Sequence, residues 1–294
     1  MTSPAPHERA GEPPADNAVV IGVDFTSAPS AKKPITVAIG RCIGAAGGRG
    51  YRLDDILLLE SLGDFERFLA SGGPWLGGFD LPFSQPRPLI EHEGWPTDWP
   101  RFVRFFCGEP RDRLRAAFRR WCDARPPGDK FAWRRADKPA GSSPAMRWAN
   151  PPVAWMMHAG IGRMLDAGLA FPAHGQRGVV GEPTRTALES YPGYTVRKVC
   201  SRSYKSDAPS KQTPERMHNR RVVVAALMAG TAGLEPTLSI SPAWRRRLIA
   251  DGSGDLLDAV ICALQAAHAG VLPRYGLPRV LDPLEGWIAS VPVG

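Results

Sequence analysis

The stretch that decides the fold is AVVIGVDFTSAPSAKKPITVAIG, residues 18 to 40, in which the first of two apolar runs ends on the carboxylate of Asp24. Both runs are rich in β-branched residues, and TSAPSAKKP, a connection containing Pro and Ser, separates them. This pattern predicts two buried strands. A third strand is expected in YRLDDILLLE, so the chain should begin with an antiparallel meander of three strands.

Outward from this meander, the pattern predicts further strands and helices. SLGDFERFLAS has its apolar residues at helical spacing and Ser61 as the N-cap, and PWLGGFDLPF reads as a fourth strand that ends, like the first, on an acid, Asp80. Basic and Pro-rich segments between about 86 and 180 predict a helical insertion. The expected elements are strands at 18–25, 35–43, 51–60, 74–83 and 185–193, and helices at 61–71, from about 214, and at 254–270. This order predicts an α/β fold with a mixed central sheet flanked by helices.

Composition narrows the class of protein. The 294 residues include 37 basic and 29 acidic side chains, and the net charge of +8 favours a polyanionic partner such as nucleic acid. The five cysteines are scattered without a CxxC pair, as expected in the reducing cytoplasm, and no apolar run is long enough for a membrane span. We expect a disordered tail over residues 1–17, and one domain over 18–294 with its insertion at about 86–180.

Acidic residues fall at one predicted end of the sheet. Asp24 closes the first strand, Asp80 the fourth, Glu189 lies in a late strand, and Asp255 and Asp258 open the last helix. If the first and fourth strands are neighbours, their acids share a rim, and an i, i+3 pair on the helix can reach it. Converging carboxylates raise one another's pKa unless a cation lies among them, and oxygen-only ligands suit Mg²⁺ or Mn²⁺. Two such ions about 4 Å apart would support hydrolysis of a phosphodiester.

Each acid also has an ordinary structural interpretation. Asp24 and Asp80 could serve only as turn residues, and Asp255, after Ser253 and Gly254, could be a first-turn acid of the helix. Glu189 could belong to a salt bridge. The functional interpretation is supported mainly by the predicted position of all these acids at the same end of the sheet.

The motifs, taken in order, resemble a known family. VIGVDFTSAP, GGFDLPFSQP, LESYPG, YKSDAPSKQTPERMHNR, GDLLDAVICALQAA and EGWIASVP are similar to segments of the uncharacterised family called domain of unknown function 429, over about residues 18 to 292. That family is regarded as a predicted nuclease with an RNase H-like fold. The resemblance therefore implies an RNase H-like mixed sheet and a metal-dependent nuclease.

The resemblance also implies roles for the acids. Asp24 and Asp80 match the metal-binding acids of the first and fourth strands, and Asp258 matches the acid of the last helix. Glu189 matches the Glu of the family's E-x-Y-P motif, as a further ligand or a base. Family members often carry His-Asp where this chain has Gly254 and Asp255, which leaves open whether Asp255 joins Asp258 as a metal ligand.

Basic residues near these acids are candidates for substrate binding. The phosphate-holding candidates between the Glu189 strand and the helix from 214 are Lys205, Lys211, Arg216 and Arg220. A second candidate surface, for binding a nucleic-acid strand, combines the arginines at 111–120 of the insertion with Trp121, Trp133, Arg134, Arg135 and Trp148. Both sets could instead be solvated side chains or core aromatics. Arg245, Arg246 and Arg247 are expected to be a solvated helix end.

Two other functions remain open from the sequence. A catalytically inactive RNase H-like module could bind nucleic acid or a protein without cutting it, although such a module has no need to gather acids. A nucleotide-binding ATPase or kinase of related fold needs a second, glycine-rich phosphate loop, and neither AAGGRG nor SGGPWLGG has the neighbouring acid and Thr. The identity of the nucleic-acid substrate is left open.

Overall fold

The computed structural model describes residues 17–44 and 49–292, and the predicted tail over 1–17 lies almost entirely outside them. The core of the fold is a six-stranded mixed sheet with the strand order β5-β4-β1-β2-β3-β6. Its strands are β1 (Val19–Asp24), β2 (Ile35–Ile43), β3 (Gly50–Leu59), β4 (Trp75–Asp80), β5 (Arg185–Glu189) and β6 (Thr237–Ser239). The first three strands are antiparallel, whereas β1 and β4 are parallel neighbours. The predicted α/β class, meander and pairing of the first and fourth strands are confirmed.

Side chains along β1 point alternately to the two faces of the sheet, and each face packs against its own apolar cluster. Ile21 and Val23 join an apolar cluster with residues of the inserted helices, whereas Val20 joins a cluster with α8 and α10. Successive side chains of a strand point to opposite faces, so Asp24, two residues beyond Gly22, points to the α10 face. The same alternation sends Asp80 to the α10 face, because it follows Gly78 by two residues.

The helix α10 (Asp255–Gly270) lies directly on β1 and β4 because two glycines allow it. A Cβ on Gly22 would lie 2.0 Å from the carbonyl oxygen of Ala259, and one on Gly78 would lie 2.3 Å from that of Cys262. No side chain fits in these gaps, so the backbone of α10 is held against the two strands that carry Asp24 and Asp80. The first turn of the helix is thereby brought to the rim where those strands end.

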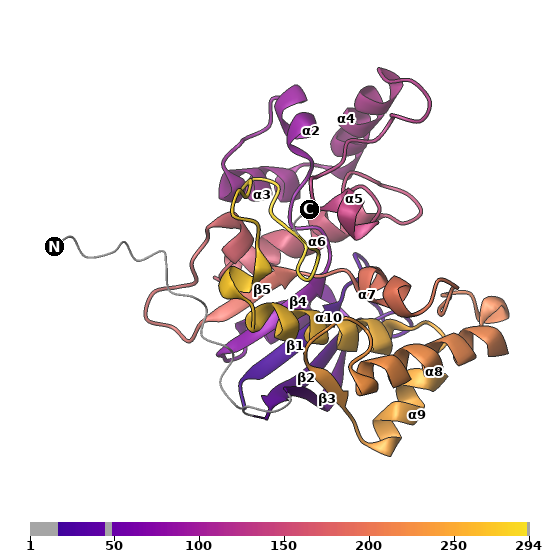
Figure 1. Ribbon diagram of the computed structural model, residues 1–294. Helices are drawn as coiled ribbons and strands as arrows, with labels where there is room; N and C mark the ends of the chain where they lie inside the picture. The colour runs from indigo at the N-terminus through magenta and orange to yellow at the C-terminus, as the bar shows by residue number, and fades with distance from the viewer. Residues whose placement is uncertain (1–16, 45–48, 293–294) are drawn as a thin grey trace.

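The other helices divide between the two faces (Figure 1). The insertion gathers above the sheet, and α8 and α9 lie to one side of it. The helices are α1 (Leu62–Ala70), α2 (Arg87–His92), α3 (Trp99–Gly108), α4 (Arg111–Asp123), α5 (Asp137–Ala140), α6 (Val153–Asp166), α7 (Pro192–Val199), α8 (Pro214–Ala229) and α9 (Pro242–Ala250). Short 3₁₀ turns are η1 (Pro172–His174), η2 (Pro209–Lys211) and η3 (Pro273–Gly276). Among the described residues, no helix combines the length and apolar character needed to cross a membrane.

The expected element boundaries agree closely with the structure except in two strands. The strand expected over 185–193 ends at Glu189, because Pro192 occupies the first turn of α7. The strand expected over 74–83 ends at Asp80. At α1 the expected N-cap is confirmed, since the Ser61 hydroxyl accepts a hydrogen bond from the backbone amide of Asp64.

Candidate active site

Asp24 and Asp80 stand side by side at one rim of the sheet. They are direct partners in the parallel register of β1 and β4, and both side chains are partly buried. Because both point to the α10 face, their carboxylates lie on the same side of the sheet. The rim predicted from the sequence is therefore formed by these two residues.

The first turn of α10 brings two further acids to this rim. Gly254 precedes the helix with a φ of 81°, a conformation that glycine adopts without strain, and its carbonyl accepts the first helical bond from Asp258. Asp255 and Asp258 are three residues apart and share a helical face. Asp255 is partly exposed, whereas Asp258 is fully buried.

Asp258 is held by two consecutive side chains from the loop before α8. The hydroxyl of Tyr204 donates to one carboxylate oxygen of Asp258, and the ammonium of Lys205 donates to the other. Burial alone would lower the pKa of Lys205, but Asp258 and its neighbours raise that pKa well above its usual value. The ammonium therefore remains charged and supplies one positive charge among the acids.

One lysine does not balance the charge of this rim. Burial raises the pKa of Asp24 well above its usual value; Lys205 opposes that effect, and the charges of Asp258, Asp255 and Asp80 add to it. Burial likewise raises the pKa of Asp80 to about 7. The charge of Lys205 opposes this increase, and the charges of Asp258 and Glu189 add to it. The pKa of Asp255 is also raised, mainly by burial. Further positive charge at the rim would stabilise all of these carboxylates in their ionised form.

Glu189 is placed on the other face of the sheet. It pairs in register with Phe79, which belongs to the core beneath the insertion, so its side chain points away from α10. Both carboxylate oxygens accept hydrogen bonds from the guanidinium of Arg134, and one also accepts from the backbone amide of Phe83. Arg134 also pairs with buried Asp137. The structure therefore separates Glu189 from the acids on the α10 face and places it in a buried ion pair.

The four candidate phosphate-binding residues have different surroundings. Lys205 lies within the acid cluster, but Arg220 is buried and donates to the carbonyls of Ile249 and Tyr204. Arg220 therefore anchors the loop that carries Tyr204 and is poorly placed to contact a substrate. Arg216 is partly exposed and donates to the carbonyl of Lys211, whose own side chain is exposed. No hydrogen bond or ion pair among the described residues joins Arg216 or Lys211 to the rim acids.

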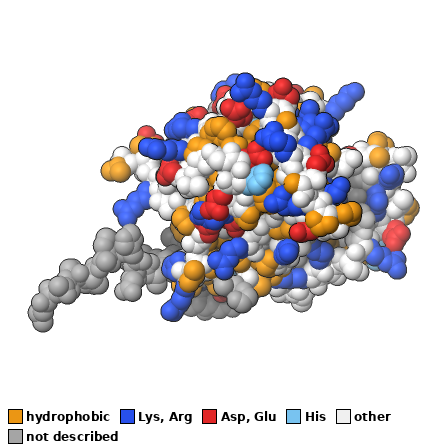
Figure 2. All heavy atoms as spheres, turned by 90° about the horizontal axis from the view of Figure 1, so that it is seen from above, with side chains coloured by type: hydrophobic (Ala, Val, Ile, Leu, Met, Phe, Trp, Pro, Cys, Tyr) orange, Lys and Arg blue, Asp and Glu red, His pale blue; other side chains and the backbone are white. Residues whose placement is uncertain are grey.

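The aromatic residues proposed as a strand-binding surface mostly belong to the core of the insertion. Trp121 is buried beneath the guanidinium of Arg125, and Trp148 stacks on Phe118. Trp133 remains partly exposed. Figure 2, which looks down on the inserted helices, shows many basic side chains with acidic ones among them. Arg120, for example, pairs with Glu93, which offsets part of the positive charge of this face.

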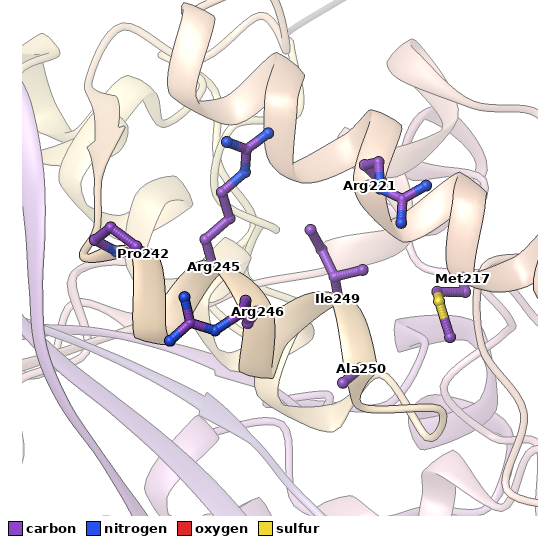
Figure 3. A pocket seen from close by; sticks show the side chains of 7 residues that line it. All are labelled: Met217, Arg221, Pro242, Arg245, Arg246, Ile249 and Ala250. Carbon is purple, nitrogen blue, oxygen red and sulfur yellow. The ribbon is translucent and has the colours of Figure 1, made fainter.

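A cavity of about 310 Å³ opens beside the acids. Asp80, Asp258 and Lys205 line it, and the other lining residues lie within 191–204. A larger groove of about 470 Å³ lies between α8 and α9 (Figure 3). That groove is lined by Met217, Arg221, Pro242, Arg245, Arg246, Ile249 and Ala250, and none of the rim acids contributes to it. The smaller cavity is therefore the one in contact with the candidate site.

Sequence reasoning did not predict the structural roles of three residues, Tyr204, Arg134 and Tyr191. Tyr204 is the immediate neighbour of Lys205 in RSYKSD, and its role as a partner of Asp258 depends on a contact between residues 54 positions apart. Arg134 is 55 positions from its partner Glu189. Tyr191 lies in the LESYPG motif, to which the sequence analysis assigns a role only through Glu189. A buried arginine in a Pro-rich insertion gives no local signal of its partner.

In this conformation, the described side chains of the rim are not arranged as a metal centre. Over residues 17–44 and 49–292, no group of three or more His, Cys, Asp or Glu side chains is arranged so that it could hold a metal ion. The Lys205 ammonium, bound to Asp258, is the cation of the cluster in this conformation. The donor chemistry nevertheless fits a hard cation, since the rim offers carboxylate oxygens whose pKa values are raised, mainly by burial and further by the neighbouring acids.

Comparisons with known proteins give no match: no family model, no curated protein and no solved structure is similar enough to this chain to be recognised.

Proposed function

We propose that this protein is a metal-dependent nuclease with an RNase H-like fold, which hydrolyses phosphodiester bonds at the rim formed by β1, β4 and α10. The observation that carries the proposal is the meeting of Asp24 and Asp80, in register on neighbouring strands, with the first turn of α10. The strand order, with an antiparallel meander followed by a parallel fourth strand, also supports the family resemblance. Fold alone does not establish activity, so the acids are the stronger argument.

Asp24, Asp80 and Asp258, with Asp255, would hold Mg²⁺ or Mn²⁺. These residues offer oxygen ligands only, which hard divalent cations prefer over zinc-type sulfur and nitrogen sets. The raised pKa values of Asp24, Asp80 and Asp255 give the site an electrostatic reason to take up a cation. When bound, the ion would supply an activated water and neutralise charge on the phosphate.

The other residues of the site position the acids and the substrate. Tyr204 and Lys205 fix the orientation of the Asp258 carboxylate, and the Lys205 ammonium offers a positive charge to a substrate phosphate. Lys211, which is exposed, and Arg216, which is partly exposed, would contact flanking phosphates. Glu189 is better suited to positioning the end of β4 than to binding the ion, because it points to the face of the sheet opposite α10 and is paired there with Arg134.

The substitution Asp24→Asn tests this proposal directly. It keeps the size of the side chain but removes a charged ligand, so Mn²⁺-dependent cleavage of labelled DNA, RNA and hybrid oligonucleotides should fall at least about a hundredfold. The matched control is Asp129→Asn, which changes an exposed acid in the loop after α4 and should leave cleavage unchanged. Full activity in Asp24→Asn would remove the rim from the mechanism.

A nucleic-acid binding module without catalysis is the second candidate function. The observation that favours it is Lys205, which already supplies a cation where the acids meet. In that case oligonucleotides would bind to the wild-type protein and remain uncut with either metal, and Asp24→Asn would bind them as well as or better than the wild type.

A further inference from the structure

The cavity beside the rim carries features that the proposed chemistry does not use. Besides Asp80, Asp258 and Lys205, it is lined by Tyr191, Gly193 and Arg197 at the start of α7. Because Lys205 lines the cavity, a nucleotide whose phosphate lies near Lys205 can place its sugar and base in this space. The side chains of Tyr191 and Arg197 can therefore influence which substrates the site binds.

The lining of the cavity includes an aromatic ring and a guanidinium in contact with each other, those of Tyr191 and Arg197. The guanidinium of Arg197 lies over the Tyr191 ring at 5.2 Å from its centroid and donates a 3.3 Å hydrogen bond to the Tyr191 hydroxyl. A further bond from Arg197 to the carbonyl of Ala140 fixes its position. Aromatic rings and arginine planes are the two protein groups that stack on nucleic-acid bases.

Gly193 keeps this pair of side chains in place. A Cβ at this position would lie 2.9 Å from the Tyr191 ring and 3.1 Å from the Arg197 guanidinium, so any side chain would displace the stacked pair. The backbone of Tyr191 is fixed as well, because its amide and carbonyl both bond to the side-chain amide of Gln265 on α10. Tyr191 is thus held by the same helix that carries Asp258.

The size of the cavity limits what can enter. A volume of about 310 Å³ lies at the lower end of the roughly 300–1,000 Å³ found for small-ligand pockets. One nucleotide is of this scale, whereas a base inside a duplex is paired and stacked and has to leave the helix to reach these side chains. Some of the lining residues are exposed, Ser201 and Ser203 among them, so the cavity can be reached from solvent.

We propose that this cavity binds one unpaired nucleotide, with its base against Tyr191 and Arg197 and its phosphate toward Lys205. Resting on the proposed function, this makes the substrate single-stranded nucleic acid, such as an end, a flap or a loop, and disfavours intact duplex. The nucleotide site itself requires no cleavage, so it can be tested separately.

The binding experiment uses adenosine 5′-monophosphate, which as a monoester is not a substrate for phosphodiester hydrolysis. Calorimetric titration in the presence of Mg²⁺ should show binding to the wild-type protein, with the dissociation constant at least about tenfold higher for Tyr191→Ala. Tyr191→Phe retains the ring and should bind within about threefold of the wild type. Inorganic phosphate, used as a second probe, should bind more weakly than the nucleotide and be unaffected by Tyr191→Ala.

A blocking variant keeps the test informative if Tyr191→Ala unfolds. Ser201→Trp adds bulk to an exposed cavity residue, and Ser210→Trp adds the same bulk to an exposed residue outside the cavity. Nucleotide binding should be lost in the first variant and unchanged in the second. Equal nucleotide affinity in Ser201→Trp and the wild type, or equal affinity for inorganic phosphate and the nucleotide, would overturn the proposal.

Cleavage assays separate this inference from the proposed function. Single-stranded oligonucleotides should be cut at least about tenfold faster than the matched duplex, and Ser201→Trp should reduce that rate. Equal cutting of both substrates, with Asp24 required and Ser201→Trp without effect, would refute the single-strand inference and leave the nuclease intact. Cavity-dependent nucleotide binding without cleavage of any substrate would support the nucleotide site and refute the nuclease.

Discussion

At the scale of single residues, the rim acids are placed at a cost to the metal-free protein. Burial raises the pKa of Asp80 to about 7, so the folded state holds this proton more tightly than the unfolded chain does. The pKa of this carboxyl is about 4 in the unfolded chain. As the pH rises from about 4 to 7, the folded protein therefore loses the stability that the more tightly held proton provides. The ionised carboxylate therefore lowers the free energy of unfolding at pH 7 and above.

The substitution Asp80→Asn should stabilise the protein when divalent metal is absent. Because the amide cannot ionise, we expect a gain in the free energy of unfolding of roughly 1–2 kcal/mol at pH 8 that shrinks toward pH 4. Urea denaturation in a chelator at pH 4.5, 6 and 8 measures this dependence. A variant less stable than the wild type at pH 8, or a difference that does not vary with pH, would show that Asp80 carries no such penalty.

The residues at this rim were predictable to different degrees. The placement of Asp24 and Asp80 followed from strand patterns, because a hydrophobic run fixes both the strand and the point where it ends. The separation of Glu189 from them did not, since sequence patterning does not give the register between β4 and β5 or the face on which a residue points. The buried partner of Glu189, Arg134, lies in a segment whose long-range contacts have no periodic signature.

At the scale of elements, the contact between α10 and the sheet decides whether the acids meet. The glycines of VVIGVD and WLGGFD were unremarkable in the sequence, yet Gly22 and Gly78 set the distance from the helix to both strands. Backbone contact this close leaves no room for a side chain. The final helix itself was predicted well, because a long apolar segment has few other structures available to it.

A methyl group at Gly22 should separate the helix from the strands. In Gly22→Ala the new Cβ would meet the backbone of Ala259 and Ala263, at 2.0 Å and 2.2 Å, so α10 has to move and carry Asp258 with it. We expect a loss of about 3 kcal/mol or more in the free energy of unfolding, or failure to fold.

The matched control for this change is Gly108→Ala at the end of α3, where a Cβ would have no neighbour within 4 Å. Thermal or urea denaturation should place the control within about 1 kcal/mol of the wild type. Equal stability of the two variants would mean that α10 does not approach β1 as closely as described.

The boundary between β5 and α7 was the least predictable of the described elements. The segment RTALESYPG has strand character through Glu189, and the proline that follows fits a turn as well as a helix start. Only the structure shows that Pro192 begins α7 and that Tyr191 stands at the junction. This junction contributes Tyr191 to the lining of the cavity beside the rim, and sequence patterning alone did not indicate that cavity.

At the scale of the whole molecule, a buried ion network ties the insertion to the sheet. Arg134, from the insertion, reaches Glu189 at the end of β5 and Asp137 at the start of α5, and all three side chains are buried. The sequence predicted an insertion over about 86 to 180 but gave no indication of how it attaches. A buried pair of this kind contributes little net stability when intact, yet loss of one partner leaves buried charge unpaired.

Removing the arginine should therefore be costly. In Arg134→Ala, two buried carboxylates lose their cation, and we expect a loss of about 3–5 kcal/mol in the free energy of unfolding. Arg135→Ala, at the exposed neighbouring position, is the control and should change stability by less than about 0.5 kcal/mol. Urea denaturation at pH 7.5 measures the free energy of unfolding of both variants. Similar values for the two would indicate that Arg134 does not hold the insertion in place.

The central claim, that the rim of β1, β4 and α10 takes a divalent cation, is tested most directly by calorimetric titration of Mn²⁺. The wild-type protein is titrated at pH 7.5, alone and with a single-stranded oligonucleotide, beside Asp24→Asn and the control Asp129→Asn. We expect Mn²⁺ to bind to the wild type and to Asp129→Asn, with affinity lowered at least about tenfold in Asp24→Asn. No binding to the wild type under either condition, or equal binding to wild type and Asp24→Asn, would contradict the assignment of the rim as a metal site.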